Sequence, residues 1–256
     1  MIRVENLTKL FGSQVAVDEL SLEIPAGQIV GFLGPNGAGK STTLKMLTGM
    51  LKPTRGSASI CGFDLQTHPV EAKRNVGFVP ESGAVFESLT GLEYLEMIAA
   101  LYGIPQEPAR ERIRQFITFF DLSFETLTEK LLGAYSKGMR RKVVITAALL
   151  HNPPVVLFDE PLDGLDANAA VGFKALIQRL AAEGKTIVYS SHILDVVERV
   201  CHRVLIIDKG KLRLDGKPDE LVASHGSGTL ERLFTEITGG TELEQRAEDF
   251  AKTFRP

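Results

Sequence analysis

The chain has 256 residues, of which 44% are hydrophobic and 24% charged, and its formal net charge is −3. These values are ordinary for a globular protein with a sizeable core, and they provide no basic field that would favour nucleic acid as a partner. The two cysteines, Cys61 and Cys201, form neither a disulfide framework nor a metal-binding spacing, so we expect free, buried thiols in a reducing compartment. No apolar run approaches the roughly 20 residues that cross a bilayer, and the mixed charge of residues 1–5 predicts no signal peptide.

The chain begins with two predicted strands. Ile2–Leu10 and Gln14–Ile24 both alternate apolar and polar residues, which is the period of a half-buried strand. A turn at Gly12-Ser13 joins them, so we expect an antiparallel pair ahead of a parallel sheet. Phe11 at this turn is open to two interpretations: it is an aromatic of the core or turn, or a flat apolar face for an adenine ring.

The next segment contains the strongest motif of the chain. Gln28–Leu33 is an apolar run that predicts a buried strand, and Ser41–Met50 has the apolar spacing of a helix. The loop between them fits G-x-x-x-x-G-K-[ST] and consists of Gly34, Pro35, Asn36, Gly37, Ala38, Gly39, Lys40, Ser41 and Thr42. Such a loop directs backbone N–H groups and a lysine at phosphates, while the hydroxyl after the lysine suits Mg²⁺. The sequence therefore predicts a phosphate-binding loop.

Short elements follow this loop. We expect a strand at Ser57–Cys61, a helix at Val70–Arg74 and a strand at Val76–Val79 that ends in Pro80-Glu81. The polar loop Ser82–Ser88 then leads into a block of about residues 89–151 that has no strong strand pattern. We interpret this block as a helical subdomain inserted into the α/β core.

Three helices are predicted inside the block, at Gly91–Tyr102, Glu107–Phe120 and Lys137–Leu150. Ser136 is a suitable N-cap for the third helix, and Ser136 with Gly138 at a helix start also forms a second surface that attracts anions. A basic cluster in this helix would ordinarily be a solvated face; it comprises Lys137, Arg140, Arg141 and Lys142.

The strand at Val155–Phe158 ends in two adjacent acids, Asp159 and Glu160. Open α/β sheets bind ligands at the carboxyl edge of their strands, and alternation along a strand directs neighbouring side chains differently. A helix at Asn168–Ala182 and a strand at Thr186–Tyr189 follow, and His192 lies just beyond that strand.

The last part of the chain predicts a hairpin from Val204–Ile207 and Lys211–Leu214, then a helix at Thr229–Thr238. We expect a single α/β domain over residues 1–240, with a mainly parallel sheet and the helical insertion. Residues 241–256 form an acidic amphipathic pattern that we interpret as a short helical tail.

Taken in order, these motifs resemble the ATPase subunit of ATP-binding cassette (ABC) transporters, a family with the P-loop NTPase fold. Residues 34–42 match the phosphate loop, and residues 155–161 match the strand that carries the magnesium-assisting Asp and the general-base Glu. Residues 135–139 stand where the family has its Leu-Ser-Gly-Gly-Gln signature, and residues 162–166 look like the loop that crosses to a second subunit. The resemblance spans about residues 1–240.

The resemblance implies ATP and Mg²⁺ as cofactors. Phe11 would stack on the adenine, and Asp159 and Glu81 would contact the magnesium together with Ser41. Glu160 would orient or deprotonate the attacking water while His192 holds the γ-phosphate, which is the chemistry that phosphoryl transfer to water requires. Three residues would face the ATP of a second subunit, namely Ser136, Gly138 and Asp166.

Four departures from the family pattern, together with the ending LERLFTEITG, look like the exporter branch for drugs, antibiotics and polysaccharides. They are Glu81 for Gln, Tyr135 for Leu, Lys137 for Gly and Met139 for Gln. The resemblance then implies a motor peripheral to the cytoplasmic face of the inner or plasma membrane. Its partners would be a polytopic membrane subunit and a second ATPase subunit, identical or different, without nucleic acid.

Two other functions share some of these motifs. An ABC ATPase of DNA repair or translation would usually carry two cassettes, a coiled coil or a basic arm, none of which is visible in this sequence. A small-molecule kinase would share the loop but would have no use for residues 135–139 or 163–166. The motifs together favour the transporter motor.

Overall fold

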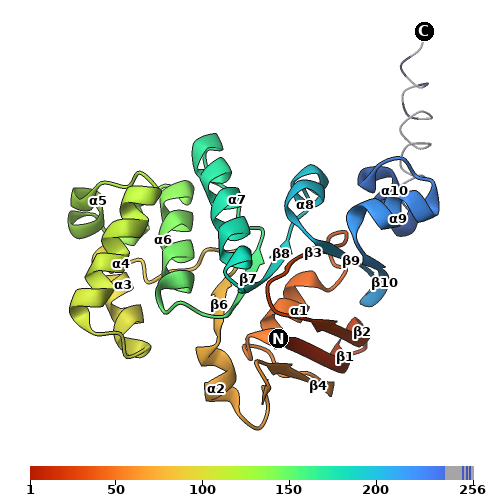
Figure 1. Ribbon diagram of the computed structural model, residues 1–256, viewed down its shortest axis with the longest axis horizontal. Helices are drawn as coiled ribbons and strands as arrows, with labels where there is room; N and C mark the ends of the chain where they lie inside the picture. Colours follow the sequence, from red (N-terminus) through yellow and green to blue (C-terminus); the bar gives the residue numbers. More distant parts are fainter. Residues whose placement is uncertain (240–249, 251, 253, 255–256) are drawn as a thin grey trace.

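The computed structural model describes residues 1–239, 250, 252 and 254. The helical tail predicted for residues 241–256 therefore lies outside the described residues, apart from three isolated positions. The described chain forms two sheets with helices around them (Figure 1), which confirms the predicted α/β class with an antiparallel N-terminal part.

The smaller sheet has four strands in the order β2-β1-β4-β5, and all of its pairs are antiparallel. Its strands are β1 (Ile2–Phe11), β2 (Gln14–Ile24), β4 (Arg55–Ile60) and β5 (Phe63–Asp64). Phe11 ends β1 rather than lying in the turn, and half of its side chain is exposed. The two-residue β5 has no pattern long enough to have been predicted.

The larger sheet has six strands in the order β10-β9-β3-β8-β7-β6. Its strands are β3 (Ile29–Leu33), β6 (Val76–Val79), β7 (Val155–Asp159), β8 (Thr186–Ser190), β9 (Arg203–Asp208) and β10 (Lys211–Gly216). All neighbours are parallel except β9 and β10, which form the predicted hairpin. Every residue of β3, β7 and β8 is buried, as expected for strands that are covered on both faces.

The carboxyl ends of β3, β6, β7 and β8 meet at one edge of this sheet because the four strands are parallel. The segments that follow them are therefore brought together, although they come from very different parts of the chain. They are the loop of residues 34–42, the turn at Pro80-Glu81, the acids Asp159-Glu160 and His192.

The helices cover both faces of the large sheet, with hydrophobic clusters on either side. Their bounds are α1 (Lys40–Leu47), α2 (Pro69–Arg74), α3 (Gly91–Leu101), α4 (Gln106–Phe119), α5 (Phe124–Glu129), α6 (Lys137–Leu150), α7 (Ala167–Ala182), α8 (Leu194–Val200), α9 (Pro218–His225) and α10 (Leu230–Thr238). The expectation that the first helix continues to Met50 is wrong, because Gly49 adopts a φ of 65° that ends it. The short helices α5 and α8 were not predicted.

Helices α3 to α6 share a hydrophobic core of their own. Figure 1 shows α3, α4 and α5 at one end of the molecule, with α6 between them and the large sheet, and α9 and α10 at the other end. Helix α6 thus touches both the helical group and the sheet, and it contacts β6 directly.

Both cysteines are free, but only one matches the prediction of a buried thiol. Cys201 is buried, whereas Cys61 is partly exposed because it lies at the turn after β4, outside the strand. Within the described residues, no helix combines the length and the apolar character that a membrane span needs.

Candidate active site

The loop of residues 34–42 lies between β3 and α1 and is packed tightly against two other strands. A Cβ atom on Gly34 would collide with the carbonyl oxygen of Ile207, and one on Gly39 would collide with that of Ala16. Gly39 also has a φ of 106°, which side chains other than that of glycine rarely permit. The glycines therefore let the backbone of the loop lie directly against β2 and β9.

Lys40 is the first residue of α1, and its ammonium group lies inside the loop. Its Nζ donates to the carbonyl of Gly34 at 2.5 Å and to that of Pro35 at 3.2 Å, and the residue is only 8% exposed. Burial lowers the pKa of Lys40, while the negative charges of Glu160, Asp159 and Glu81 oppose that shift. A poorly solvated cation near the orphan N–H groups of a helix start favours an anionic ligand.

Asp159 and Glu160 end β7 and make different contacts, as the alternation predicted. The buried Asp159 accepts a hydrogen bond from the hydroxyl of Ser190 at 3.0 Å. Glu160 Oε2 lies 2.9 Å from Nδ1 of His192, and the backbone N–H of Glu160 donates to the carbonyl of Ser190 at 3.1 Å. The strand end of β8 therefore holds both acids in place.

These groups open onto one cavity of about 490 Å³, a size that suits a nucleotide-sized ligand. Its lining consists of Phe11, Gln14, Ala16, residues 36–42, Glu81, Asp159 and Glu160. Most of the predicted site residues are thus brought together. Gly34 and Pro35, the first two residues of the loop, do not line the cavity, and neither does His192, which contacts the lining residue Glu160. Gln14 and Ala16 were missed because nothing in their chemistry distinguishes them.

The other predicted site residues lie outside this cavity, around the start of α6. The hydroxyl of Ser136 accepts a hydrogen bond from the N–H of Met139 at 3.2 Å, so Ser136 is the N-cap of α6. A Cβ atom on Gly138 would lie 2.5 Å from the carbonyl oxygen of Gly164. Asp166 caps α7 through the N–H of Ala169 at 2.8 Å.

Two ion pairs tie α6 to the loop after β7. Lys137 Nζ lies 2.7 Å from Asp163 Oδ2, and Lys142 Nζ lies 3.0 Å from Asp166 Oδ2. The expectation of a solvated basic face is wrong for Arg141 and Lys142, which are buried because α6 lies between the helical group and the sheet. Burial of these cations has no signature in the sequence, since a basic cluster is usually solvated.

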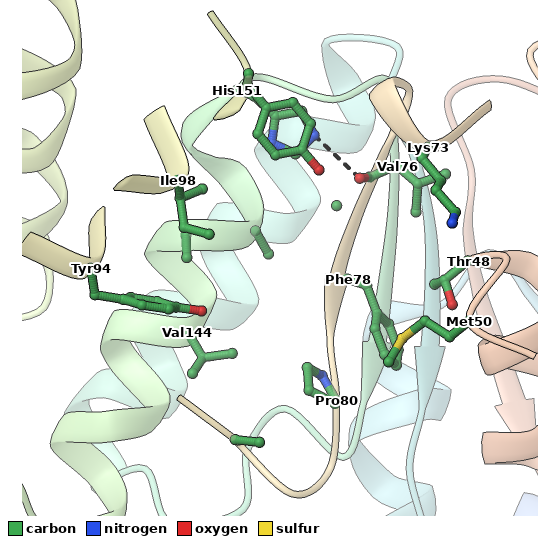
Figure 2. Close-up of a pocket in the computed structure, with 15 residues that line it drawn as sticks. Thr48, Met50, Lys73, Val76, Phe78, Pro80, Tyr94, Ile98, Val144 and His151 are labelled. Atoms are coloured by element: carbon green, nitrogen blue, oxygen red, sulfur yellow. Dashed lines mark hydrogen bonds between the residues drawn. The ribbon is translucent and has the colours of Figure 1, made fainter. Parts of the chain in front are cut away.

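A second cavity, of about 340 Å³, lies between α3, α6 and β6 (Figure 2). Its lining is mostly apolar and includes Met50, Phe78, Tyr94 and Ile98. His151 stacks on Tyr102 with ring centroids 3.7 Å apart, and its Nε2 lies 3.2 Å from the carbonyl oxygen of Val76. Burial lowers the pKa of His151 to about 4, so the imidazole is neutral at pH 7.

The sequence is similar to ATP-binding subunits of known transporters. Residues 17–163 match the protein-family model described as ABC transporter. The chain is 38% identical over 221 residues to the ABC transporter ATP-binding protein NatA of Bacillus subtilis, covering 86% of this chain and 89% of NatA. It is 35% identical over 244 residues to the daunorubicin/doxorubicin resistance ATP-binding protein DrrA of Streptomyces peucetius, covering 95% of this chain and 73% of DrrA.

Solved structures agree with these relatives. An ATP-binding subunit of an ABC transporter superposes with a TM-score of 0.87 at 31% identity, covering 93% of this chain and 99% of that one. A dimeric ATP-binding cassette in a post-hydrolysis state with ADP and Pi superposes with a TM-score of 0.77 at 27% identity, covering 85% of this chain and 98% of that one.

Proposed function

Because the chain belongs to the ABC transporter family, where it is an ATP-binding ATPase subunit, we propose that it drives an exporter through a separate membrane subunit. The observation that carries this proposal is the cavity that joins the phosphate loop to Glu81, Asp159 and Glu160. It combines an anion-binding loop with carboxylates at the place where a γ-phosphate would lie. Such an arrangement suits phosphoryl transfer to water.

ATP binding begins with the loop. The N–H groups of residues 36–42 and the start of α1 would surround the phosphates, and the Lys40 ammonium would exchange its two carbonyl acceptors for phosphate oxygens. Phe11 lines the same cavity with half of its side chain exposed. The ammonium of Lys9 lies 5.2 Å from the centroid of its ring, and the adenine would stack on the exposed part of the ring.

The residues of the cavity also fit Mg²⁺. Ser41, Asp159 and Glu81 supply hard oxygen donors within it, and Mg²⁺ ordinarily takes one or two carboxylates with phosphates and water. Among the described residues, no group of three or more acidic, histidine or cysteine side chains could hold a metal, so the phosphates of ATP would complete the ligand shell. The ion would neutralise charge that develops on the phosphates.

Glu160 is our candidate for the general base, and His192 for the group that contacts the γ-phosphate. The contact of 2.9 Å between Glu160 Oε2 and His192 Nδ1 holds the two side chains next to each other. The Glu160 side chain is 15% exposed and that of His192 is 71% exposed, so His192 has room to turn toward a bound phosphate. The hydrogen bond from the N–H of Glu160 to β8 does not involve His192, so it would persist if the His192 side chain turned.

Ser136, Gly138 and Asp166 do not line the cavity of their own chain. We propose that they complete the site of a second ATPase subunit, identical or different, in a two-fold arrangement. The dimeric relative with ADP and Pi supports this assembly, and so does the exposed start of α6, which attracts anions.

The cavity of Figure 2 supports the proposal of a membrane partner. It lies between the sheet and the helical group, and its apolar lining continues into the exposed Met50. We propose that the polytopic membrane subunit docks here and that the chain works at the cytoplasmic face of the membrane. Export as the direction of transport is supported by the relatives named for drug resistance and for Nod factor export.

The experiment compares ATP binding and hydrolysis in the wild type, Lys40→Ala and Glu160→Gln. Lys40→Ala should lose tight ATP binding, because its charge serves the phosphates. Glu160→Gln should bind ATP with wild-type affinity and lose hydrolysis by at least about 100-fold. Circular dichroism serves as the folding control for both. Unchanged ATP affinity in Lys40→Ala would refute the phosphate-loop assignment, and full activity in Glu160→Gln would refute the assignment of the base.

A further inference from the structure

Arg141 is a fully buried guanidinium that lies beside the active site. It belongs to α6, one turn after Lys137, and is only 2% exposed. Its Nη1 donates to the carbonyl of Pro80 at 2.7 Å, its Nη2 to the carbonyl of Glu81 at 2.7 Å, and its Nε to the carbonyl of Asp163 at 3.3 Å. One side chain thereby joins α6 to two separate loops.

Both loops carry residues of the nucleotide cavity. The turn at Pro80-Glu81 ends β6 and places the Glu81 side chain in the cavity lining. The other loop runs from Glu160 to Asp163, and the N–H of Asp163 donates to the carbonyl of Glu160 at 3.2 Å. A displacement of either carbonyl therefore shifts the backbone next to an acid of the site.

The charge of Arg141 has no partner in direct contact among the ion pairs of the described residues. Burial lowers the pKa of Arg141, while the charges of Asp163, Asp159, Glu81 and Glu160 act in the opposite direction. Because an arginine side chain keeps its charge in proteins, the guanidinium is a cation whose charge interacts with the carboxylates of the cavity. A neutral replacement would leave buried carbonyls without donors and the acids without this compensation.

We propose that Arg141 is a positioning residue for ATP hydrolysis, which holds the turn of Glu81 and the loop of Glu160 against α6 in their reactive arrangement. This inference rests on the roles proposed above for Glu81 and Glu160. It also gives α6 a second function. Besides presenting Ser136 to the other subunit, the helix would hold Glu81, a proposed Mg²⁺ ligand, in the cavity of its own chain. Lysine is a poor substitute, since an ammonium lacks the fork that reaches three carbonyls.

A purely structural role would lower thermal stability and leave the kinetic constants of the folded protein unchanged. The positioning role predicts a different pattern. The loop of residues 34–42 has no contact with Arg141 among the hydrogen bonds described, so the affinity for ATP should stay within about twofold. The kcat should fall by about 10- to 100-fold, which is the usual effect of a small misplacement of reacting groups.

The test measures kcat, ATP affinity and the Mg²⁺ concentration for half-maximal activity in the full chain with Arg141→Gln and Arg141→Lys. We expect Arg141→Gln to lower kcat as above and to raise the Mg²⁺ requirement severalfold, because the turn of Glu81 loses its donor. Arg141→Lys should be intermediate in both. If Arg141→Gln does not fold, Arg141→Lys decides the question on the same two quantities.

Arg112→Gln is the matched control. The guanidinium of Arg112 donates to the carbonyl of Leu150 at 2.8 Å, at the other end of α6 and away from the cavity. The Arg112→Gln protein should lose thermal stability without a change in kcat. Folded Arg141 variants with wild-type kcat and Mg²⁺ requirement would overturn the inference, as would a loss of ATP affinity in proportion to kcat. Full activity in Glu160→Gln would instead refute the proposed base, which keeps the two failures distinguishable.

Discussion

Glu160, our candidate for the general base, has an uncommon backbone conformation. Its φ is 50°, in the left-handed region that costs a residue other than glycine about 1–2 kcal/mol. The hydrogen bond from its N–H to the carbonyl of Ser190 and the contact with His192 hold it there. Such outliers are frequent at active sites, and Glu160 lines the same cavity as the phosphate loop.

His151 should make folding stability depend on pH in a way that a variant can isolate. Its pKa is about 4 in the folded chain and about 6.5 when unfolded. The unfolded state therefore binds more protons between these values, so the stability is fully present above pH 6.5 and is lost as pH falls toward 4. Between pH 7.5 and 5 the wild type should lose about 2 kcal/mol from this group alone.

The measurement is urea unfolding of the wild type and His151→Phe at both pH values. Phenylalanine keeps the stack on Tyr102 but cannot titrate, so the stability difference between the two proteins should narrow or reverse at pH 5. All other titrating groups are common to both proteins. A stability difference that is the same at the two pH values would contradict the lowered pKa of the partly buried His151.

The substitution Glu81→Gln should affect coupling to the membrane subunit more than magnesium binding. Glu81→Gln keeps a carbonyl oxygen that can reach the ion or its water, so we expect little change in ATPase activity of the isolated chain. The larger effect should appear with the membrane subunit, because residues 81–88 join the sheet to the helical group. ATPase activity measured with and without that subunit decides this. A loss of ATPase activity that appears only in the isolated chain would refute the proposal that Glu81 acts mainly in coupling to the membrane subunit.

At the scale of elements, Ser136 and Ser123 are matched helix caps. Each hydroxyl accepts a hydrogen bond from the N–H three residues later, at 3.2 Å for Ser136 and 3.1 Å for Ser123. Ser136→Ala and Ser123→Ala should therefore each lower the free energy of unfolding by about 1 kcal/mol. Only Ser136→Ala should also weaken ATP-dependent assembly, measured by light scattering. If the two variants assembled equally well with ATP, Ser136 would act only as a helix cap and would have no role in the dimer.

Much of the element order could be predicted because the patterns are strong. The bounds of Val76–Val79 and Lys137–Leu150 were predicted correctly, since an apolar strand or an N-capped helix defines its own ends. The short α5 and α8 and the two-residue β5 were missed. They have too few residues for a periodicity that would predict them, and isolated helices of this length depend on tertiary packing for much of their stability.

At the scale of the whole molecule, the Glu160→Gln protein should form a dimer in the presence of ATP. Glutamine keeps an oxygen for hydrogen bonding but is no base, so ATP would persist and continue to bridge the Ser136 and Gly138 of a second subunit. Size-exclusion chromatography with light scattering, run with ATP and with ADP, should show the dimer only with ATP. The wild type should show it only transiently.

Ser136→Arg in the same background tests where the bridge lies. Its bulk would face the opposite subunit, so the dimer should be lost while each monomer binds ATP with unchanged affinity. A Glu160→Gln protein that stays monomeric at saturating ATP would count against self-association and would direct the search to a different second ATPase subunit.

Contacts between distant segments are what the sequence could not indicate. The phosphate loop and the acids were recognised from local motifs, but the bonds of Arg141 to Pro80 and Glu81 join residues 61 and 60 positions apart. The contact between His192 and Glu160 likewise depends on β7 and β8 being neighbours. A residue's chemistry suggests what it can bind, whereas only the fold determines what lies next to it.

The place of β3 in the sheet also constrains how the protein is made. Its two neighbours, β8 and β9, end at Ser190 and Asp208, so a ribosome that has just released the phosphate loop has released none of the strands that flank it. At about 5–20 residues per second, the loop would wait roughly 10–30 s for those strands. During that interval β3 lacks both of its neighbours, and unpaired strand edges of this kind make an unfinished chain prone to aggregation.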